Sequence, residues 1–594
     1  MPNTSRPNCR ADPLNKRPRM AAFTGIFFWV AVAAATFHAV YASVSTSPLI
    51  VLYLFALLRL AQTDQWRKAF YPGLAVGLLI AVIRLAFFWR LFSGGALALW
   101  LVYAFWIGLF VALARLCLRT SELHERLGVE QRTGVSPLTP SLSPSDGERV
   151  PFRAGEGSLA DAAKFHGSGR ASLRKLGPKW GWLLIPFIWT GLEYFRSELY
   201  YLRFSWLNVG YAFAGAPWQG ALKPVGAYGV GFLLISLASV AACLWQKSRI
   251  RALTLLLLGA GGVCLGGFLI GKESPTPSVA QVHVAGIQME FPTEKEVLVR
   301  LQDALRAHPD TELVVLSEYT FDGLVPAAVK AWCHESGRYL IVGGKDPAPG
   351  AGFYNTAYVV GPGGDIVFRQ VKAVPIQFFK DGLPAPEQKL WASPWGKIGI
   401  CVCYDLSYAR VTDRLVTLGA EAVIVPTMDV ADWGRAQHEL HARIAPVRAA
   451  EYGLPIFRLA SSGISQLVNR AGRVTATAPC PGEGAVLAGT LEMRGGGRRP
   501  LDRWLAPFAT ALTAALMVWF LVRRGPGNRP SAGEKGRDMS SATQAEPQPN
   551  CAKRLECAEL APAFGGTATV ESASKLVALQ TLRAVRLPLR PRTP

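Results

Sequence analysis

The stretch KIGICVCYDLSY (397–408) leads from a short apolar run into polar residues. An apolar run of this length, bounded by turn residues, is typical of a buried strand. Cys401 lies within the run, whereas Cys403 lies at its end and is followed directly by Tyr404 and Asp405. We therefore expect Cys401 to fill the core and Cys403 to be a candidate reactive thiol, although a single buried cysteine is more often a core residue.

The chain around this stretch, residues 278–492, predicts a globular α/β domain. Short strand-like runs alternate with helical patterns such as 293–307 and 435–452, and Gly, Pro and Asp residues mark the turns. Strands that alternate with helices indicate a layered α/β sandwich. The segment AYVVGPGGDIVF (357–368) predicts a hairpin, so the sheets should combine parallel with antiparallel pairs.

Three predicted strands of this domain end close to side chains that can take part in catalysis. ELVVLSEYTF contains Glu318, IVFRQVKAVP contains Lys372 and KIGICVCYDL contains Cys403. Ligands bind at strand ends in α/β sheets, because the loops there form a crevice. Cysteine reacts as the thiolate and needs a base, which Glu318 can supply, while Lys372 and a backbone N–H can stabilise an oxyanion. Each residue taken alone also has a common structural explanation: Cys403 as a core residue, Glu318 as a solvated carboxylate and Lys372 as a surface charge.

Long apolar segments dominate the remainder of the chain. Of the 594 residues 50% are hydrophobic, and the formal net charge is +22. Several apolar runs approach the ~20 residues that an α-helix needs to cross the hydrocarbon core of a membrane. The eight runs are 21–42, 47–61, 72–92, 95–118, 180–197, 223–246, 252–271 and 504–522. We therefore predict a multi-span α-helical membrane domain at 21–271 with seven spans, and a last span at 504–522.

Lysine and arginine residues gather beside the predicted spans and predict how the chain is threaded. Basic clusters lie at 6–19, 67–68, 247–251 and 523–524. Lys and Arg in short loops mark the cytoplasmic side, so the N-terminus at 1–20 is expected in the cytoplasm. The same threading places 272–503 on the opposite side. Because the positive charge is concentrated beside the spans, we predict a membrane protein and no nucleic-acid partner.

Two segments differ in composition from everything around them. Residues 119–178 and 525–594 are rich in Ser, Pro, Gly and charge, with no sustained apolar period. Such composition is typical of disordered chain. We expect a disordered insert within the membrane domain and a disordered cytoplasmic tail.

The sequence offers little sign of a metal or cofactor. In HELHARI, His438 and His441 are three residues apart, whereas the two histidines of a zinc-binding H-E-x-x-H helix are four apart. We therefore predict neither a metal site nor a cofactor.

The motifs, taken in order, resemble a known family. LSEYTF (316–321), VKAVP (371–375) and CVCYDLSY (401–408) resemble the Glu-Lys-Cys signature of the carbon–nitrogen hydrolase (nitrilase) superfamily. Apolar spans on both sides are similar to its membrane branch, the apolipoprotein N-acyltransferases. Residues 204–234 (FSWLNVGYAFAGAPWQGALKPVGAYGVGFLL) resemble the membrane-side loop and helix of that branch. The resemblance implies that 278–492 folds as a nitrilase-like αββα sandwich.

The resemblance also implies an activity and a location. In this family the cysteine takes an acyl chain from a phospholipid as a thioester and passes it to the N-terminal amine of an S-diacylglyceryl-cysteine lipoprotein. By their places in the motifs, Glu318 is implied as the base, Lys372 as the oxyanion partner and Cys403 as the nucleophile. The implied location is the bacterial inner membrane, with the catalytic domain in the periplasm. The implied partners are the phospholipid donor, the apolipoprotein acceptor and membrane lipid.

Further residues match the family in part. Trp206, Tyr404 and Asp405 match residues that the resemblance implies in substrate binding. The family's second glutamate, a few residues beyond the lysine, has no counterpart in VPIQFFKDG, where Phe378 and Lys380 stand near its position. Two alternatives therefore remain: a membrane-tethered amidase or nitrilase that acts on a small amide, and a catalytically impaired binding protein of the same fold. Eight spans favour an acyl donor that is buried in lipid.

Overall fold

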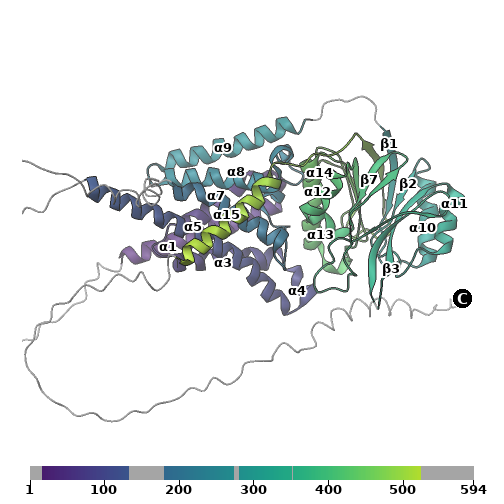
Figure 1. Cartoon of the computed structure of the whole chain (residues 1–594), viewed down its shortest axis with the longest axis horizontal. Coiled ribbons are helices and arrows are strands. Elements are labelled where there is room, and N and C mark those ends of the chain that lie inside the picture. Colours follow the sequence, from purple (N-terminus) through teal and green to yellow (C-terminus); the bar gives the residue numbers. More distant parts are fainter. Residues whose placement is uncertain (1–16, 133–179, 273–279, 351, 523–594) are drawn as a thin grey trace, which may run out of the picture. The chain divides into compact units, whose positions relative to one another are not determined.

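The computed structural model describes residues 17–132, 180–272, 280–350 and 352–522 (Figure 1). Most of the basic N-terminus predicted at 1–20, most of the insert predicted at 119–178 and the tail predicted at 525–594 lie outside the described residues. Contacts divide the described residues into two units. The large unit comprises those up to Pro375 together with Asp381–Ala514, and the small unit comprises Ile376–Lys380 together with 515–522.

The apolar sequence forms helices at each of the predicted positions (Figure 1). They are α1 (Arg17–Ala42), α2 (Ile50–Leu60), α3 (Trp66–Arg84) with the short α4 (Phe87–Phe92), α5 (Gly95–Arg132), α7 (Trp180–Tyr194), α8 (Leu222–Trp245), α9 (Arg249–Ile270) and α15 (Asp502–Val522). Six described segments are long and apolar enough to cross a membrane, namely Gly25–Ala42, Trp66–Arg84, Gly95–Arg119, Gln219–Trp245, Arg249–Ile270 and Asp502–Val522. Since α2 has 11 residues and α7 has 15, the count of eight spans stays a prediction.

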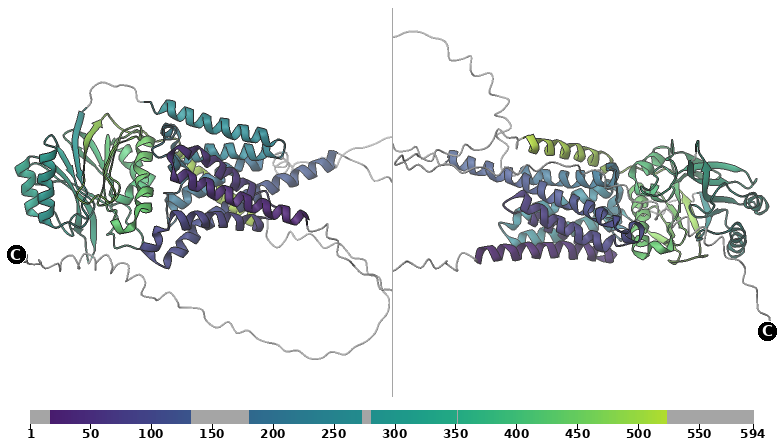
Figure 2. Two further views of the ribbon diagram at one scale, coloured as in Figure 1. Left: turned by 180° about the vertical axis from the view of Figure 1, so that it is seen from behind. Right: turned by 90° about the horizontal axis from the view of Figure 1, so that it is seen from below.

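Small residues allow α3 and α5 to pack closely. A Cβ atom added at Gly77 of α3 would lie 2.6 Å from Ala104 Cα of α5, and one at Gly73 would lie 2.8 Å from Val111 Cγ2. Such contacts are typical of membrane helices, where backbones approach each other at glycine. The helices of this part run beside one another in the further views as well (Figure 2).

The helix α5 extends further than the apolar pattern indicates. The sequence predicts the end of this span at 118, but the helix continues to Arg132, into the segment predicted as a disordered insert. Residues 119–132 (RTSELHERLGVEQR) contain three Glu, three Arg and two Leu residues and no proline. A helix that its membrane part has already nucleated propagates through such residues at little cost.

Two mixed six-stranded sheets form the α/β domain. The first has the order β12-β1-β2-β3-β4-β5, with bounds Val486–Met493, Ala280–Ile287, Leu313–Val315, Tyr339–Pro347, Phe353–Val360 and Ile366–Val371. The second has the order β11-β10-β9-β8-β7-β6, with bounds Val474–Thr477, Gln466–Val468, Ile456–Ala460, Ala422–Thr427, Gly396–Ile400 and Leu390–Ser393. The strands β1-β2-β3 and β7-β8-β9 are parallel, and the flanking pairs are antiparallel, including the predicted hairpin β4-β5.

The two sheets pack face to face. A Cβ atom added at Gly286 of β1 would lie 2.5 Å from Leu459 Cδ1 of β9, so glycine permits the close approach. The helices α10 (Glu294–Ala307) and α11 (Ala327–Ser336) cover the outer face of the first sheet, and α12 (Ala409–Thr417), α13 (Arg435–Ala442) and α14 (Ile444–Tyr452) lie beside the second (Figure 1). The predicted αββα sandwich is confirmed.

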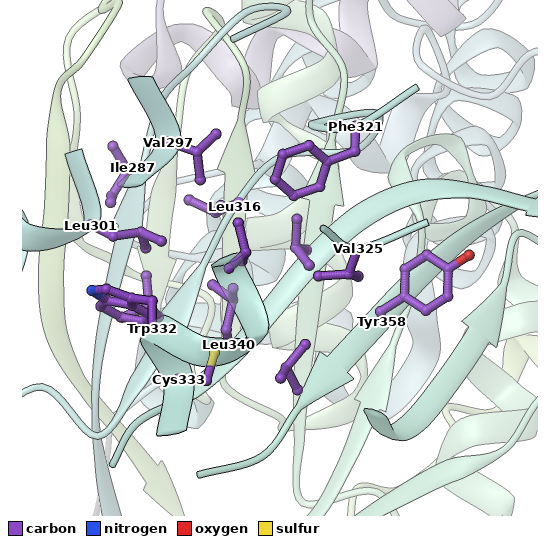
Figure 3. Packing of buried hydrophobic residues seen from close by; sticks show 14 of the residues in the cluster. Ile287, Val297, Leu301, Leu316, Phe321, Val325, Trp332, Cys333, Leu340 and Tyr358 are labelled. Carbon is purple, nitrogen blue, oxygen red and sulfur yellow. The ribbon is translucent and has the colours of Figure 1, made fainter. Parts of the chain in front are cut away.

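An apolar core holds the outer helices against the first sheet (Figure 3). Val297 and Leu301 of α10 pack with Trp332 of α11 and Leu340 of β3, and all four side chains are buried. The helix α10 begins with a capping box, in which Thr293 and Glu296 satisfy each other's backbone N–H groups. The packing of α10 and α11 holds the first sheet in place, and two residues of the site follow strands of this sheet.

Candidate active site

Glu318, Lys372 and Cys403 all lie in loops that follow strands, as the sequence predicts. Glu318 lies shortly after β2, Lys372 directly after β5, and Cys403 at the start of the 3-10 helix η7 (Cys403–Ser407), which follows β7. The strands β2 and β5 belong to the first sheet and β7 belongs to the second. The residues therefore meet between the two sheets, and all three are almost fully buried.

Glu318 is the centre of this cluster. Its Oε1 accepts a hydrogen bond from Lys372 Nζ at 2.8 Å, and its Oε2 accepts one from the backbone N–H of Met428 at 2.9 Å. The thiol of Cys403 donates to the carbonyl oxygen of Met428 at 3.7 Å and also lies next to the Glu318 carboxylate. The three residue types that the sequence singles out are therefore in one contact group.

The surroundings of Cys403 favour the protonated form of its thiol. Burial raises its pKa well above the usual value, the negative charge of Glu318 raises it further, and the positive charge of Lys372 opposes both. A thiol in this state needs a neighbouring base to remove its proton during reaction. Glu318 is placed to be that base. Cys401 is fully buried, and burial likewise raises its pKa, in keeping with the core role predicted for it.

The backbone at the site is strained at two residues. Cys403 has a φ of 53° and Tyr319, directly after Glu318, has a φ of 52°. This left-handed conformation costs a residue with a Cβ atom about 1–2 kcal/mol. Such strain persists where surrounding contacts hold it, and it gathers at functional sites. It also fixes the direction from which the thiol and the carboxylate approach each other.

Asp405 holds the Cys403 turn against the strand end that carries Lys372. Its Oδ1 accepts from Val374 N at 2.7 Å, and its Oδ2 accepts from Ala373 N at 3.0 Å and from Val402 N at 3.2 Å. Burial raises the pKa of Asp405 to about 6, although Lys372 and these N–H groups lower it. The geometry indicates a positioning role, and the predicted contact of Asp405 with substrate stays a prediction.

Asp381 is a site residue that the sequence analysis missed. Its Oδ2 lies 2.7 Å from Lys372 Nζ, and its Oδ1 accepts from Asn355 Nδ2 at 2.9 Å and from the Tyr319 hydroxyl at 2.8 Å. Asn355 Nδ2 also donates to Glu318 Oε1 at 2.6 Å. A second carboxylate is therefore present at the lysine, supplied by an aspartate. The signal in the sequence is the acid of VPIQFFKDG, which stands one residue beyond Lys380.

Two carboxylates keep Lys372 charged. Burial acts against its positive charge, but Asp381 and Glu318 outweigh that effect and raise the pKa of Lys372 well above its usual value. An ammonium group that is buried between two acids remains a fixed positive charge beside the thiol. Such a charge is suited to stabilising an oxyanion.

Trp206 brings the membrane-side loop to the site. Its Nε1 donates to Ser407 Oγ at 3.1 Å, and its ring lies 6.0 Å from the ring of Tyr404 and stacks on His441 at 4.7 Å. The hydroxyl of Tyr404 donates to the carbonyl of Arg203 at 3.1 Å. Trp206 and Tyr404 therefore lie together beside the cysteine turn, and their predicted contact with substrate stays a prediction.

Arg448 braces the cysteine turn from the helix α14. Its Nε donates to Leu406 O at 3.1 Å and its Nη2 to Ser407 O at 2.8 Å, while its Nη1 donates to Glu451 Oε2 at 2.7 Å. These contacts fix the carbonyls of η7. The sequence analysis missed Arg448, because an arginine in a helical pattern reads as a solvated charge.

The two histidines that the sequence analysis considered are bound within the protein. His441 Nδ1 lies 2.8 Å from Asp429 Oδ1, and Asp429 Oδ2 accepts from Arg458 at 2.5 Å. His438 Nε2 lies 3.0 Å from Val430 O. Among residues 17–132, 180–272, 280–350 and 352–522, no group of three or more His, Cys, Asp and Glu side chains is arranged to hold a metal ion.

The fold and the contact group define a class of protein: a membrane-associated member of the carbon–nitrogen hydrolase superfamily. The family model described as carbon-nitrogen hydrolase matches residues 302–494, which include Glu318, Lys372 and Cys403. The family model described as apolipoprotein N-acyltransferase N-terminal domain matches residues 160–240, which include Trp206. In both of these regions the chain is similar to the apolipoprotein N-acyltransferases, the membrane branch of that superfamily.

Curated relatives carry the same family name. The chain is 24% identical to an apolipoprotein N-acyltransferase of Shewanella oneidensis, over 58% of this chain and 74% of the relative. It is 28% identical to one of Azotobacter vinelandii, over 57% and 72%. It is 26% identical to one of Methylococcus capsulatus, over 62% and 77%.

Solved structures of carbon–nitrogen hydrolases are similar to part of this chain. A carbon–nitrogen hydrolase of Helicobacter pylori G27 is 19% identical with a TM-score of 0.33, covering 41% of this chain and 95% of that chain. Nit3 of Saccharomyces cerevisiae is 18% identical with a TM-score of 0.32, covering 39% of this chain and 94% of that chain.

Proposed function

We propose that this chain is an N-acyltransferase of the membrane. It takes an acyl chain from a phospholipid onto Cys403 as a thioester and transfers it to the N-terminal amine of an S-diacylglyceryl-cysteine lipoprotein. The observation that carries the proposal is the buried contact of Cys403 with Glu318 and Lys372, next to Trp206 from the membrane-side loop. The names of the relatives supply the acyl group, its transfer to nitrogen and an apolipoprotein as the acceptor, and the phospholipid donor is part of the proposal.

In the first half-reaction Glu318 removes the proton of the Cys403 thiol as the sulfur attacks the ester carbonyl of the phospholipid. Negative charge develops on the carbonyl oxygen, and the Lys372 ammonium and a backbone N–H stabilise it. The C–O bond to glycerol then breaks, and Glu318 returns its proton to the departing alkoxide. The products are a lysophospholipid and an acyl thioester on Cys403.

In the second half-reaction the amine of the lipoprotein attacks the thioester carbonyl. Glu318 accepts a proton from the nitrogen as the C–N bond forms, and the C–S bond breaks when the tetrahedral intermediate collapses. The sulfur leaves as a thiolate and regains the proton from Glu318. The product is an amide, and the enzyme returns to its initial state, as ping-pong transfer requires.

Residues around the reacting atoms hold them in place. Asp381 and Glu318 keep Lys372 protonated, so that a cation faces the developing oxyanion. Asp405 and Arg448 fix the turn on which Cys403 stands. Trp206 and Tyr404 are proposed to contact the acyl chain or the acceptor.

Intact-mass spectrometry of the purified full-length protein after incubation with phospholipid tests this function. A hydroxylamine-labile acyl adduct is expected on the wild type and on Cys401→Ser, and is expected to be lost in Cys403→Ser. The adduct should disappear when a diacylglyceryl-cysteine peptide is added, with the acyl group recovered on the peptide amine. An unacylated but alkylatable Cys403 would favour the amidase alternative, and an unacylated, unreactive Cys403 would favour the binding protein.

A further inference from the structure

A cavity of about 400 Å³ lies apart from the Cys403 cluster. It is formed where the start of α8 and the end of α9 meet the end of α14 and the chain after β12. None of Glu318, Lys372, Asp381 and Cys403 is among its lining residues. The cavity is therefore a second feature, which the proposed reaction does not use.

The lining of this cavity is strongly cationic. One acidic residue, Glu492, is among the described residues that line the cavity. Arg494 Nη2 lies 2.9 Å from the carboxylate of Glu492. The basic residues that line it are Lys223, Lys272, Arg470, Arg494 and Arg498. Five cations against one carboxylate leave a surplus of four positive charges around a single hollow. Walls of one sign concentrate the field and attract an ion of opposite charge.

Four glycines form part of the wall of the hollow. Gly220, Gly271, Gly453 and Gly496 belong to the lining. Gly220 and Gly271 approach each other so closely that a Cβ atom at Gly220 would lie 2.4 Å from Gly271 N. Small residues leave room for a ligand between the long basic side chains, and cations that converge on such a space match the oxygens of a phosphate group.

The cavity lies at the ends of two candidate membrane spans. Lys223 is in the first turn of α8, within the segment Gln219–Trp245, and Lys272 follows Arg249–Ile270 directly. The hydrocarbon core of a bilayer is about 30 Å thick, and the headgroups add about 10–15 Å in total. Residues at the ends of spans therefore lie at the depth of the lipid headgroups, where phosphodiester groups are concentrated.

Membrane topology alone does not account for these charges. The other ends of α8 and α9 carry Lys247, Arg249 and Arg251, the kind of loop that marks the cytoplasmic side. That preference puts basic residues at one end of a helix pair, whereas here both ends are basic. The cluster around Lys223 and Lys272 needs another reason, and a bound anion supplies one.

We infer that this basic cavity binds the phosphate of a phospholipid headgroup. The bound lipid is separate from the acyl donor at Cys403, and it ties α14 and the chain after β12 to the membrane surface. Basic pockets between membrane helices hold anionic headgroups in the same way. The inference stands whether or not Cys403 forms a thioester.

The test uses the full-length protein in detergent, titrated with phosphatidylglycerol and followed by native mass spectrometry. The variant Lys223→Gln/Lys272→Gln/Arg498→Gln removes three cations of the cavity. The control Lys247→Gln/Arg249→Gln/Arg251→Gln removes three from the other end of the same helices. We expect the cavity variant to bind phosphatidylglycerol about tenfold or more weakly than the wild type, and the control to bind it as the wild type does. Diacylglycerol lacks a phosphate, so we expect none of the three proteins to bind it specifically.

Equal lipid binding by all three proteins would overturn the inference. A second arm separates a lipid from free phosphate: inorganic phosphate is added to the delipidated protein and thermal unfolding is recorded. If phosphate raises the Tm of the wild type but not of the cavity variant, while phosphatidylglycerol does not distinguish them, the ligand is the free ion and the lipid assignment is wrong. Unfolding in the absence of ligand also shows whether the cavity variant is folded.

Discussion

Lys372 is enclosed more completely than any other charge of the contact group, because its ammonium lies 2.8 Å from Glu318 and 2.7 Å from Asp381 with no exposed surface. Glu318 is proposed to be the catalytic base, whereas Asp381 keeps Lys372 protonated. Mutation of Glu318 and mutation of Asp381 should therefore have different effects, although both carboxylates contact the Lys372 ammonium.

Replacement of Asp381 should act through Lys372. In Asp381→Asn one of the two charges that raise the pKa of Lys372 is lost, so this pKa falls. If the protonated lysine is needed, the alkaline decline of the thioester-forming rate moves to lower pH, so the loss of rate relative to the wild type is greatest at the alkaline end of the profile. The pH profile from 6 to 10 measures this, and Asp381→Glu should restore it in part. A uniform loss at every pH would point to a merely structural role.

Replacement of Glu318 separates the acidity of the thiol from its reactivity. The Glu318 carboxylate raises the pKa of Cys403, so Glu318→Gln should lower this pKa and make alkylation at a given pH faster. Loss of the base should nevertheless slow acylation by about 10²–10⁴-fold. Mass spectrometry of the Cys403 peptide after iodoacetamide gives the first quantity, and the rate of adduct formation gives the second. Acylation that survives in Glu318→Gln would exclude this residue as the base.

At the scale of elements, the strand ends were predictable and the loops between them were not. Glu318, Lys372 and Cys403 stand where an apolar run stops, which is a local pattern that the sequence displays. Asp381 reaches Lys372 through a loop whose path depends on the whole fold, and Arg448 reaches η7 from a helix that is distant in sequence. The left-handed φ of Cys403 has no local signature either, because surrounding contacts impose it.

The cluster of Asp429, His441 and Arg458 joins the loop after β8 to α13 and β9, and it gives a prediction at the scale of elements. Burial alone would raise the pKa of Asp429, but His441 and Arg458 outweigh it and hold the pKa below its usual value. The stabilisation is therefore complete above the unfolded pKa of about 3.9 and is lost as the pH falls towards the lower folded value.

Asp429→Asn should destabilise the protein by about 3–5 kcal/mol at pH 7, because Arg458 then remains buried without its counter-charge. The difference from the wild type should shrink at pH 3, where the Asp429 carboxylate of the unfolded chain is largely protonated. Denaturant unfolding of both proteins in detergent at the two pH values measures it. An equal difference at both pH values would mean that packing, not charge, sets the cost.

At the scale of the whole molecule, hydropathy predicted where the apolar helices lie, but it did not establish how many of them span the membrane. Hydropathy detects apolar length, and α2 and α7 are apolar but short. Whether a short helix crosses the bilayer depends on its neighbours, which a linear pattern does not contain. The threading therefore rests on the basic clusters, and it can be tested without counting spans.

Cysteine labelling tests the proposed orientation. Lys389 is an exposed residue of the α/β domain, and Arg249 lies exposed at the start of α9, in the loop predicted to be cytoplasmic. A membrane-impermeant maleimide added to intact spheroplasts should label Lys389→Cys above the background of the native cysteines. It should label Arg249→Cys only after the membrane is opened, because Lys and Arg in short loops are retained inside. Labelling of Arg249→Cys in sealed spheroplasts, with Lys389→Cys protected, would reverse the topology and place the Cys403 cluster in the cytoplasm.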